Sequence, residues 1–115
     1  MRGINMGLLR QKIKQRLEKY LELDVNGIRN KILNVFISLK KATVEKIYSI
    51  LSKEYDVSQN VVASMIGYIH SKLGILRAHK ESYKTPIEYS LNENYSDLVQ
   101  SALKKSTVIA VNDYH

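Results

Sequence analysis

Few side chains in this sequence could perform acid–base, metal or nucleophilic chemistry, and their spacing favours none of the three. The three histidines, His70, His79 and His115, stand at no spacing that would hold a metal ion. The sequence contains no cysteine, which excludes thiolate chemistry and disulfides. Glu18 and Glu22 are better explained as surface charge than as a catalytic pair. Since a phosphate-binding glycine loop and a nucleophile elbow are also missing, we expect a non-enzymatic protein without a metal ion or cofactor.

The basic residues are the other chemically distinctive group, and they are unevenly placed. Of the 115 residues, positions 1–55 hold twelve basic and five acidic side chains, whereas positions 56–115 hold six of each. The whole net charge of +7 therefore lies in the first half. Such an excess favours polyanions such as DNA, RNA or an anionic membrane, but it is also a common way to keep a protein in solution. Charge alone leaves both interpretations open.

The length and the apolar runs limit the class of protein. A chain of 115 residues suits one globular domain with appended segments. The most apolar run, residues 32–39, is far shorter than the roughly 20 residues that a membrane-spanning helix needs. The first ten residues lack the apolar stretch and the cleavage site of a secretory signal. We therefore expect a cytoplasmic protein with no membrane partner.

Hydrophobic residues recur at helical spacing in five segments and at alternating spacing in two. The predicted helices cover residues 5–23, 28–40, 44–55 and 58–72, and a last helix begins at Asn94 or Ser96 and ends near Lys105. The predicted strands cover residues 75–81 and 87–91, with a tip around Ser82, Tyr83 and Lys84. Residues 106–115 fit either a short strand or a loose tail.

Local signals mark the ends of two of these helices. Thr43 and Ser58 can cap the helices that follow them, because their hydroxyl oxygens can accept a backbone N–H of the first turn. Gly74 can end the helix 58–72, since glycine adopts the left-handed conformation at little cost. Helix, tight turn, helix and hairpin then follow one another over residues 42–91. We predict a mainly α fold with a small antiparallel β-hairpin (α+β), a winged helix-turn-helix with extra N- and C-terminal helices.

The chain is expected to divide into an N-terminal helix (1–24), a winged-helix domain (25–93) and a C-terminal helix with a tail (94–115). The first and last helices carry apolar stripes that we expect to be covered by another part of the protein. The stripe of the last helix could pack on the first helix of its own chain or on a second subunit, and we favour the second. The first helix could dock on the domain, pair with another copy or carry phosphates on its basic side, and we favour docking or pairing over a dedicated DNA contact. The candidates for a homodimer interface are then Leu9, Ile13, Leu17, Leu98, Val99 and Leu103.

Part of the chain resembles a known family, and the resemblance is strongest in residues 57–76, VSQNVVASMIGYIHSKLGIL. This segment is similar to the recognition-helix segment of bacterial and archaeal winged-helix repressors, with Val62, Ile66, Ile69 and Gly74 in the family's pattern. The preceding TVEKIYSILSKEY, and LRAHK followed by IEYSL, resemble the penicillinase-repressor and ferric-uptake-regulator branches. Gly74 stands about one residue later than the family's usual spacing from the capping serine. The whole chain also resembles a small uncharacterised family of archaeal proteins, which implies no established activity.

The winged-helix resemblance implies a transcription regulator that places the helix 58–72 in the major groove of double-stranded DNA and uses the hairpin 75–91 as a wing. The implied base contacts are Gln59, Asn60, Ser64 and Tyr68. The implied phosphate contacts are Lys40, Lys41, Thr43, Lys46, Arg77, His79, Lys80 and Lys84. No Arg or Lys lies on the outward face of this helix except Lys72 at its end, so the two-pronged reading of guanine is not expected.

This uncharged helix face leaves other functions open. The fold could be a winged-helix protein–protein interaction module of a larger assembly, with weak or no DNA binding. It could also bind RNA. Tyr68, in turn, could pack against the domain rather than touch a base. The metal ligands of the ferric-uptake branch are not recognisable in this sequence.

Overall fold

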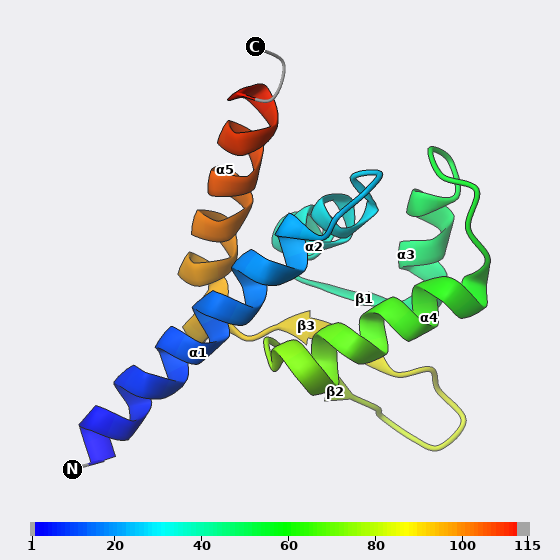
Figure 1. The fold of residues 1–115 in the computed structure, drawn as a ribbon. Helices are drawn as coiled ribbons and strands as arrows, with labels where there is room; N and C mark the ends of the chain where they lie inside the picture. Colours follow the sequence, from blue (N-terminus) through cyan, green and yellow to red (C-terminus); the bar gives the residue numbers. More distant parts are fainter. Residues whose placement is uncertain (1, 113–115) are drawn as a thin grey trace.

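The computed structural model describes the backbone of residues 2–112 and, within these, the side chains of residues 7–106. This part of the chain forms five α-helices, two short helical turns and three strands (Figure 1). In chain order they are α1 (Arg2–Glu22), α2 (Ile28–Leu39), β1 (Lys41–Thr43), α3 (Val44–Leu51), α4 (Gln59–Tyr68), η1 (Ile69–Leu73), β2 (Leu76–His79), β3 (Glu88–Leu91), η2 (Glu93–Tyr95) and α5 (Ser96–Asn112). A mainly helical chain with a small antiparallel sheet is the fold class that the sequence predicted.

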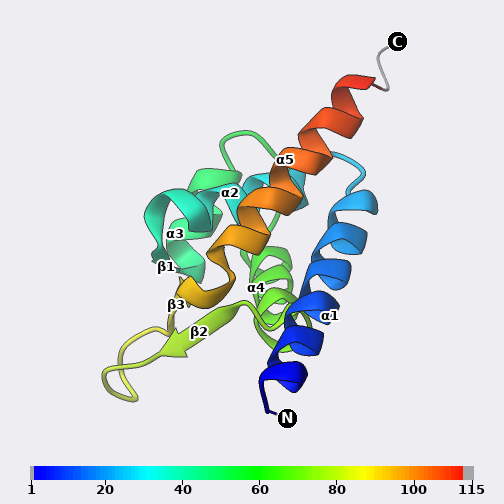
Figure 2. The same ribbon diagram turned by 90° about the vertical axis from the view of Figure 1, so that its left-hand side faces the viewer.

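All five α-helices contribute to one hydrophobic core. Figure 2 shows α1 and α5 side by side, and salt bridges join Arg10 to Asp97 and Glu18 to Lys105 across the two helices. Leu17 of α1, Phe36 of α2 and Val99 of α5 are each 0% exposed, and Ile47 of α3 and Ile66 of α4 are buried in the same cluster. Burying an apolar side chain of this size contributes about 1.5–3 kcal/mol before entropy is counted. The terminal helices are therefore packed on the winged-helix elements of their own chain.

This packing corrects the predicted dimer interface. Ile13, Leu17, Val99 and Leu103 are only 0–7% exposed, so they have almost no surface left for a second subunit. The reason is that the stripes of α1 and α5 face each other within one chain, which was the alternative that the sequence left open. Leu98 is half-buried and packs against the same core, whereas Leu9 is 45% exposed.

The sheet contains one strand more than the predicted hairpin. The hairpin itself is confirmed, because Leu76–His79 pairs antiparallel with Glu88–Leu91. The strand β1 adds to the other edge of β3, which gives the order β1-β3-β2. The sequence placed Lys41 in a connection, because a strand of three residues is too short to show an alternating pattern.

The expected helix caps around α4 are present. The Ser58 hydroxyl accepts a hydrogen bond from the Val61 N–H at 3.2 Å, and Gly74 adopts a φ of +72° at the other end. The last turn is a π-turn, η1, in which the Gly74 N–H donates to the Ile69 carbonyl, five residues earlier, at 3.1 Å. A π-turn takes up one more residue than an α-turn. That extra residue explains why Gly74 stands later in the sequence than the family's spacing.

The C-terminal helix is longer than predicted. It continues to Asn112, so the prediction of a strand or a tail is wrong for residues 106–112, while residues 113–115 lie outside the described part. Val108, Ile109 and Val111 are β-branched, and they biased the interpretation towards a strand. Among the described residues, no helix is both long and apolar enough to cross a bilayer.

Candidate nucleic-acid interface

The outward face of α4 is polar and uncharged. Val62 and Ile66 are each 0% exposed and fix the rotation of the helix on the core. The opposite face, with Asn60 and Ser64, is therefore turned to solvent. Gln59, in the first turn, is exposed as well. In the described part of the chain, none of these three side chains has a hydrogen-bond partner, so their amide and hydroxyl groups are available to a ligand.

Tyr68 belongs to this face only in part. Its ring stacks on that of Tyr20 in α1, with centroids 5.7 Å apart and an interplanar angle of 16°. The Arg29 guanidinium lies over the Tyr20 ring, 4.5 Å from its centroid. Tyr68 nevertheless keeps 48% of its surface exposed. It is thus a packing residue with a free edge, and its contact with a base stays a proposal.

The burial of Tyr20 makes the stability of the protein depend on pH in the alkaline range. Burial raises the pKa of Tyr20, and the nearby Asp24 carboxylate raises it further, whereas the Arg29 guanidinium lowers it. The pKa is about 12 instead of the usual 10.0. Between pH 10 and about pH 12 the unfolded chain loses this proton while the folded chain keeps it, so stability falls as pH rises through this window. We expect Tyr20→Phe to flatten the alkaline fall in the free energy of unfolding, measured by urea denaturation at pH 8 to 11.

The control for this prediction is Tyr83→Phe, which removes a hydroxyl from a side chain that is 83% exposed. Its pH profile should follow that of the wild type. Parallel profiles for the wild type and Tyr20→Phe would contradict the assignment of the alkaline loss to Tyr20.

The N-terminus of α3 lies beside α4 and carries two of the predicted phosphate contacts. The Thr43 hydroxyl accepts a hydrogen bond from the Lys46 N–H at 3.2 Å and so caps the helix. The side chain of Lys46 is exposed, and no salt bridge in the described chain involves it. A hydroxyl and an ammonium at a helix N-terminus suit a phosphate group.

The wing is a closed turn that presents a cation and an aromatic ring. The Thr85 N–H donates to the Ser82 carbonyl at 3.2 Å, and the Ser82 N–H donates to the Thr85 hydroxyl at 3.1 Å. Beside this turn, the Lys84 ammonium lies 5.7 Å from the centroid of the Tyr83 ring. The predicted contacts His79, Lys80 and Lys84 are all exposed.

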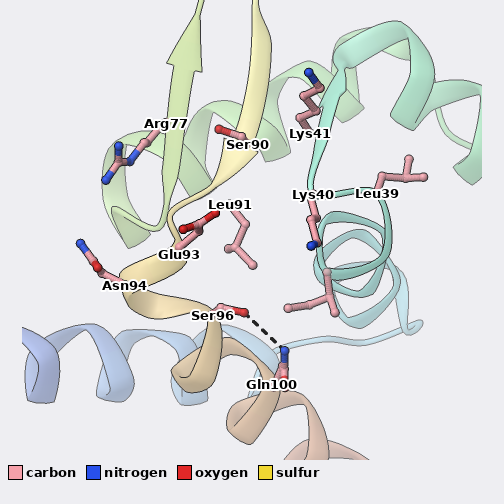
Figure 3. A pocket seen from close by; sticks show the side chains of 11 residues that line it. Leu39, Lys40, Lys41, Arg77, Ser90, Leu91, Glu93, Asn94, Ser96 and Gln100 are labelled. Atoms are coloured by element: carbon pink, nitrogen blue, oxygen red, sulfur yellow. Dashed lines mark hydrogen bonds between the residues drawn. The ribbon is translucent and has the colours of Figure 1, made fainter.

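The three remaining predicted phosphate contacts lie elsewhere, around a pocket of about 880 Å³ (Figure 3). Lys41 and Arg77 flank Ser90 in one row across the sheet. The neighbouring residue Tyr89 meets His70 of η1 edge to face, with centroids 5.6 Å apart, so Tyr89 points to the α4 side of the sheet. Side chains alternate along a strand, and the Lys41–Ser90–Arg77 row therefore points away from α4.

Lys40 completes the positive lining of this pocket. Its φ of +68° is the one positive value at a non-glycine residue in the described chain, and its carbonyl accepts a hydrogen bond from the Leu91 N–H at 3.0 Å. The α5 end of the pocket is closed by Ser96 and Gln100, which are joined by a hydrogen bond of 3.3 Å. Lys40, Lys41 and Arg77 thus form a group separate from the α4 face.

The division of the predicted phosphate contacts between the two faces of the sheet could not be predicted from the sequence. Which way Lys41 and Arg77 point depends on the register with β3, and that pairing is not local in the chain. The sequence also gave no reason to expect α1 beside α4, where the Arg16 guanidinium donates to the Lys72 carbonyl at 3.5 Å. The one sequence feature that could have pointed to a DNA contact by α1 was the series of basic residues in the first predicted helix. Among the side chains described, no cluster of three His, Asp or Glu residues could hold a metal ion.

Comparison with known proteins supports the fold and names a family. Residues 17–99 match the model of a family described as "Protein of unknown function (DUF2551)". An uncharacterized protein of Archaeoglobus fulgidus is 37% identical over 94 residues, which cover 81% of this chain and 94% of that protein. That relative is an archaeal protein.

The structure is also similar to solved structures of MarR from E. coli. A mutant MarR complexed with operator DNA has a TM-score of 0.56 and 19% identity, and the match covers 89% of this chain and 71% of that one. A second crystal structure of this MarR mutant has a TM-score of 0.56 and 19% identity, and the match covers 97% of this chain and 90% of that one. The oxidized form of MarR gives a TM-score of 0.56 at 18% identity, with 89% and 71% covered. These similarities confirm the winged-helix fold, whereas the penicillinase-repressor-like wing stays a prediction.

Proposed function

The chain belongs to the DUF2551 family of proteins of unknown function, and we propose a function for it from its fold and surface. We propose that it is a non-enzymatic transcription regulator that binds double-stranded DNA. In this proposal α4 enters the major groove and the β2–β3 hairpin acts as the wing. The protein would act in the cytoplasm, where the DNA of an archaeal cell lies.

The observation that carries the proposal is the outward face of α4. Asn60 and Ser64 are held in the open by the buried side of the helix, and they form no hydrogen bond within the described chain. Groups of this kind can donate to and accept from base edges, and an Asn amide can hold adenine with two hydrogen bonds. Cations flank the face on the α3 side and at the wing. One similar solved structure holds MarR with operator DNA.

Because the outward face of α4 carries no charge, we propose that one group of residues provides the affinity for DNA and another provides the sequence selectivity. Affinity would come from contacts to phosphates by Lys46, Lys80 and Lys84, which carry no sequence information. Selectivity would rest on Asn60 and Ser64, and it would be modest because the strong guanine contact of Arg or Lys is missing.

We also propose that the protein binds DNA as a homodimer, with its two copies on half-sites about one helical turn apart. The apolar surface left for this purpose includes Leu8 and Leu9 near the N-terminus of α1, which are 57% and 45% exposed. These two leucines replace the buried residues that the sequence suggested for the interface.

The salt dependence of binding to mixed-sequence duplex DNA tests the proposal. Each phosphate that is neutralised lowers the slope of log affinity against log salt by about 0.9. Three lysines per protomer therefore predict a slope of about −3 or steeper per protomer, measured by fluorescence anisotropy from about 50 to 300 mM salt. Absence of binding near 50 mM salt would overturn the proposal. A structured RNA that outcompetes the duplex would redirect it to RNA.

A further inference from the structure

We propose that the basic edge of α1, formed by Lys12, Arg16 and Lys19 and continued by Lys72 of η1, binds the phosphate backbone of duplex DNA beside the groove that α4 enters. This inference rests on the proposed function and adds to it a contact surface that lies outside the helix-turn-helix and the wing.

The rotation of α1 sets the position of this edge. Ile13, Leu17 and Tyr20 are buried at 3%, 0% and 6% exposure, and each follows directly after one of the three cations. Successive residues of a helix are about 100° apart, so the cations form a stripe along one flank of the buried face. All three are exposed. The basic edge is therefore a fixed feature of the way in which α1 is docked.

The docked helix brings this edge next to α4. The Arg16 guanidinium reaches the carbonyl of Lys72, at the end of η1, over 3.5 Å. One turn further along α1, Tyr20 stacks on Tyr68, the last residue of α4, with centroids 5.7 Å apart. Figures 1 and 2 agree that α1 and α4 lie on the same side of the three-stranded sheet. A duplex that lies along the exposed face of α4 would pass the basic edge.

The charges of the basic edge are not neutralised within the described chain. No salt bridge there involves any of its four cations. The acid Glu18 lies on the other flank of α1, where the Lys105 ammonium holds it at 3.3 Å. Repulsion among four exposed cations disfavours a second copy of this chain as the partner, because the copy would bring the same charges. A polyanion relieves the repulsion.

The dimensions of the stripe suit a nucleic-acid strand. Lys12 and Lys19 are seven residues apart, which is about 10 Å along a helix axis. One strand of duplex DNA places a phosphate every ~3.4 Å of its axis, so the stripe can cover about three of them. The sequence predicted phosphate contacts by Lys40, Lys41 and Arg77, but these residues line the pocket on the other face of the sheet. The basic edge of α1 provides cations on the α4 side in their place.

The test compares two triple variants of the full chain that lose the same charge. The first is Lys12→Gln with Arg16→Gln and Lys19→Gln. The second, the control, is Lys14→Gln with Lys104→Gln and Lys105→Gln, which are exposed residues of α1 and α5 away from the basic edge. Affinity for mixed-sequence duplex DNA is measured by anisotropy over a series of salt concentrations. Circular dichroism melting shows whether both variants fold.

We expect the first variant to lower the magnitude of the salt slope by about 2–3 and the affinity near 50 mM salt by about 10- to 100-fold. The control should keep the wild-type slope. Equal slopes for the wild type and the first variant would overturn the inference and leave the proposed function standing, whereas a wild type that binds no duplex would overturn both. If the triple variant fails to fold, Lys12→Gln and Arg16→Gln alone should each reduce the slope by about 0.9, and unchanged slopes would overturn the inference.

Discussion

Ser64→Asp is expected to lower the affinity for duplex DNA at least about 100-fold, because it places a carboxylate in a groove lined by phosphates and juxtaposed like charges cost several kcal/mol. Ser64 is exposed in the middle of α4, and its hydroxyl makes no hydrogen bond within the described chain. The substitution should therefore leave the fold intact. Anisotropy with a fixed duplex at constant salt measures the loss.

The matched control is Ser101→Asp on α5, which changes the net charge equally at another exposed serine. It should lose only the small, long-range part of the attraction, a few-fold at most. If the two variants lost affinity equally, α4 would not be the element that enters the groove.

Leu17→Ala is expected to lower the free energy of unfolding by about 3 kcal/mol, since the removal of a fully buried leucine side chain leaves a cavity. Leu17 is 0% exposed between α1 and the rest of the core. Single domains are stable by only about 5–15 kcal/mol, so this loss is a large fraction of the total. Urea denaturation at neutral pH measures it.

Leu23→Ala, one residue after the end of α1, is the control. Leu23 is 57% exposed, and its truncation should cost less than about 1 kcal/mol. Equal losses at the two positions would mean that α1 is not docked on its own chain through the Leu17 face. The position of the basic edge beside α4 would then have no structural basis.

Features that depend on neighbours in sequence could be predicted. The caps at Thr43 and Ser58 and the left-handed Gly74 follow from the chemistry of one residue and its next turn, and all three are present. The buried and exposed faces of α4 follow from helical periodicity alone. The uncharged character of that face could therefore be read from the sequence, together with its consequence for guanine.

Features that depend on distant pairing could not be predicted. The strand β1 exists because Lys41–Thr43 pairs with residues more than 40 positions away, and the same pairing turns Lys41 towards the pocket. Likewise, the sequence shows the apolar stripes of α1 and α5 but not that they meet in one chain. The docking of α1 then decides which of its many cations lie beside α4.

The most direct test of the central claim, that the exposed face of α4 meets duplex DNA, is a titration of the ¹⁵N-labelled protein with a mixed-sequence duplex at low salt, followed by NMR. We expect the amide resonances of residues 59–72 and of the wing tip at Ser82–Thr85 to shift most. Shifts confined to the pocket around Lys40, Arg77 and Gln100, with those of α4 unchanged, would contradict the account.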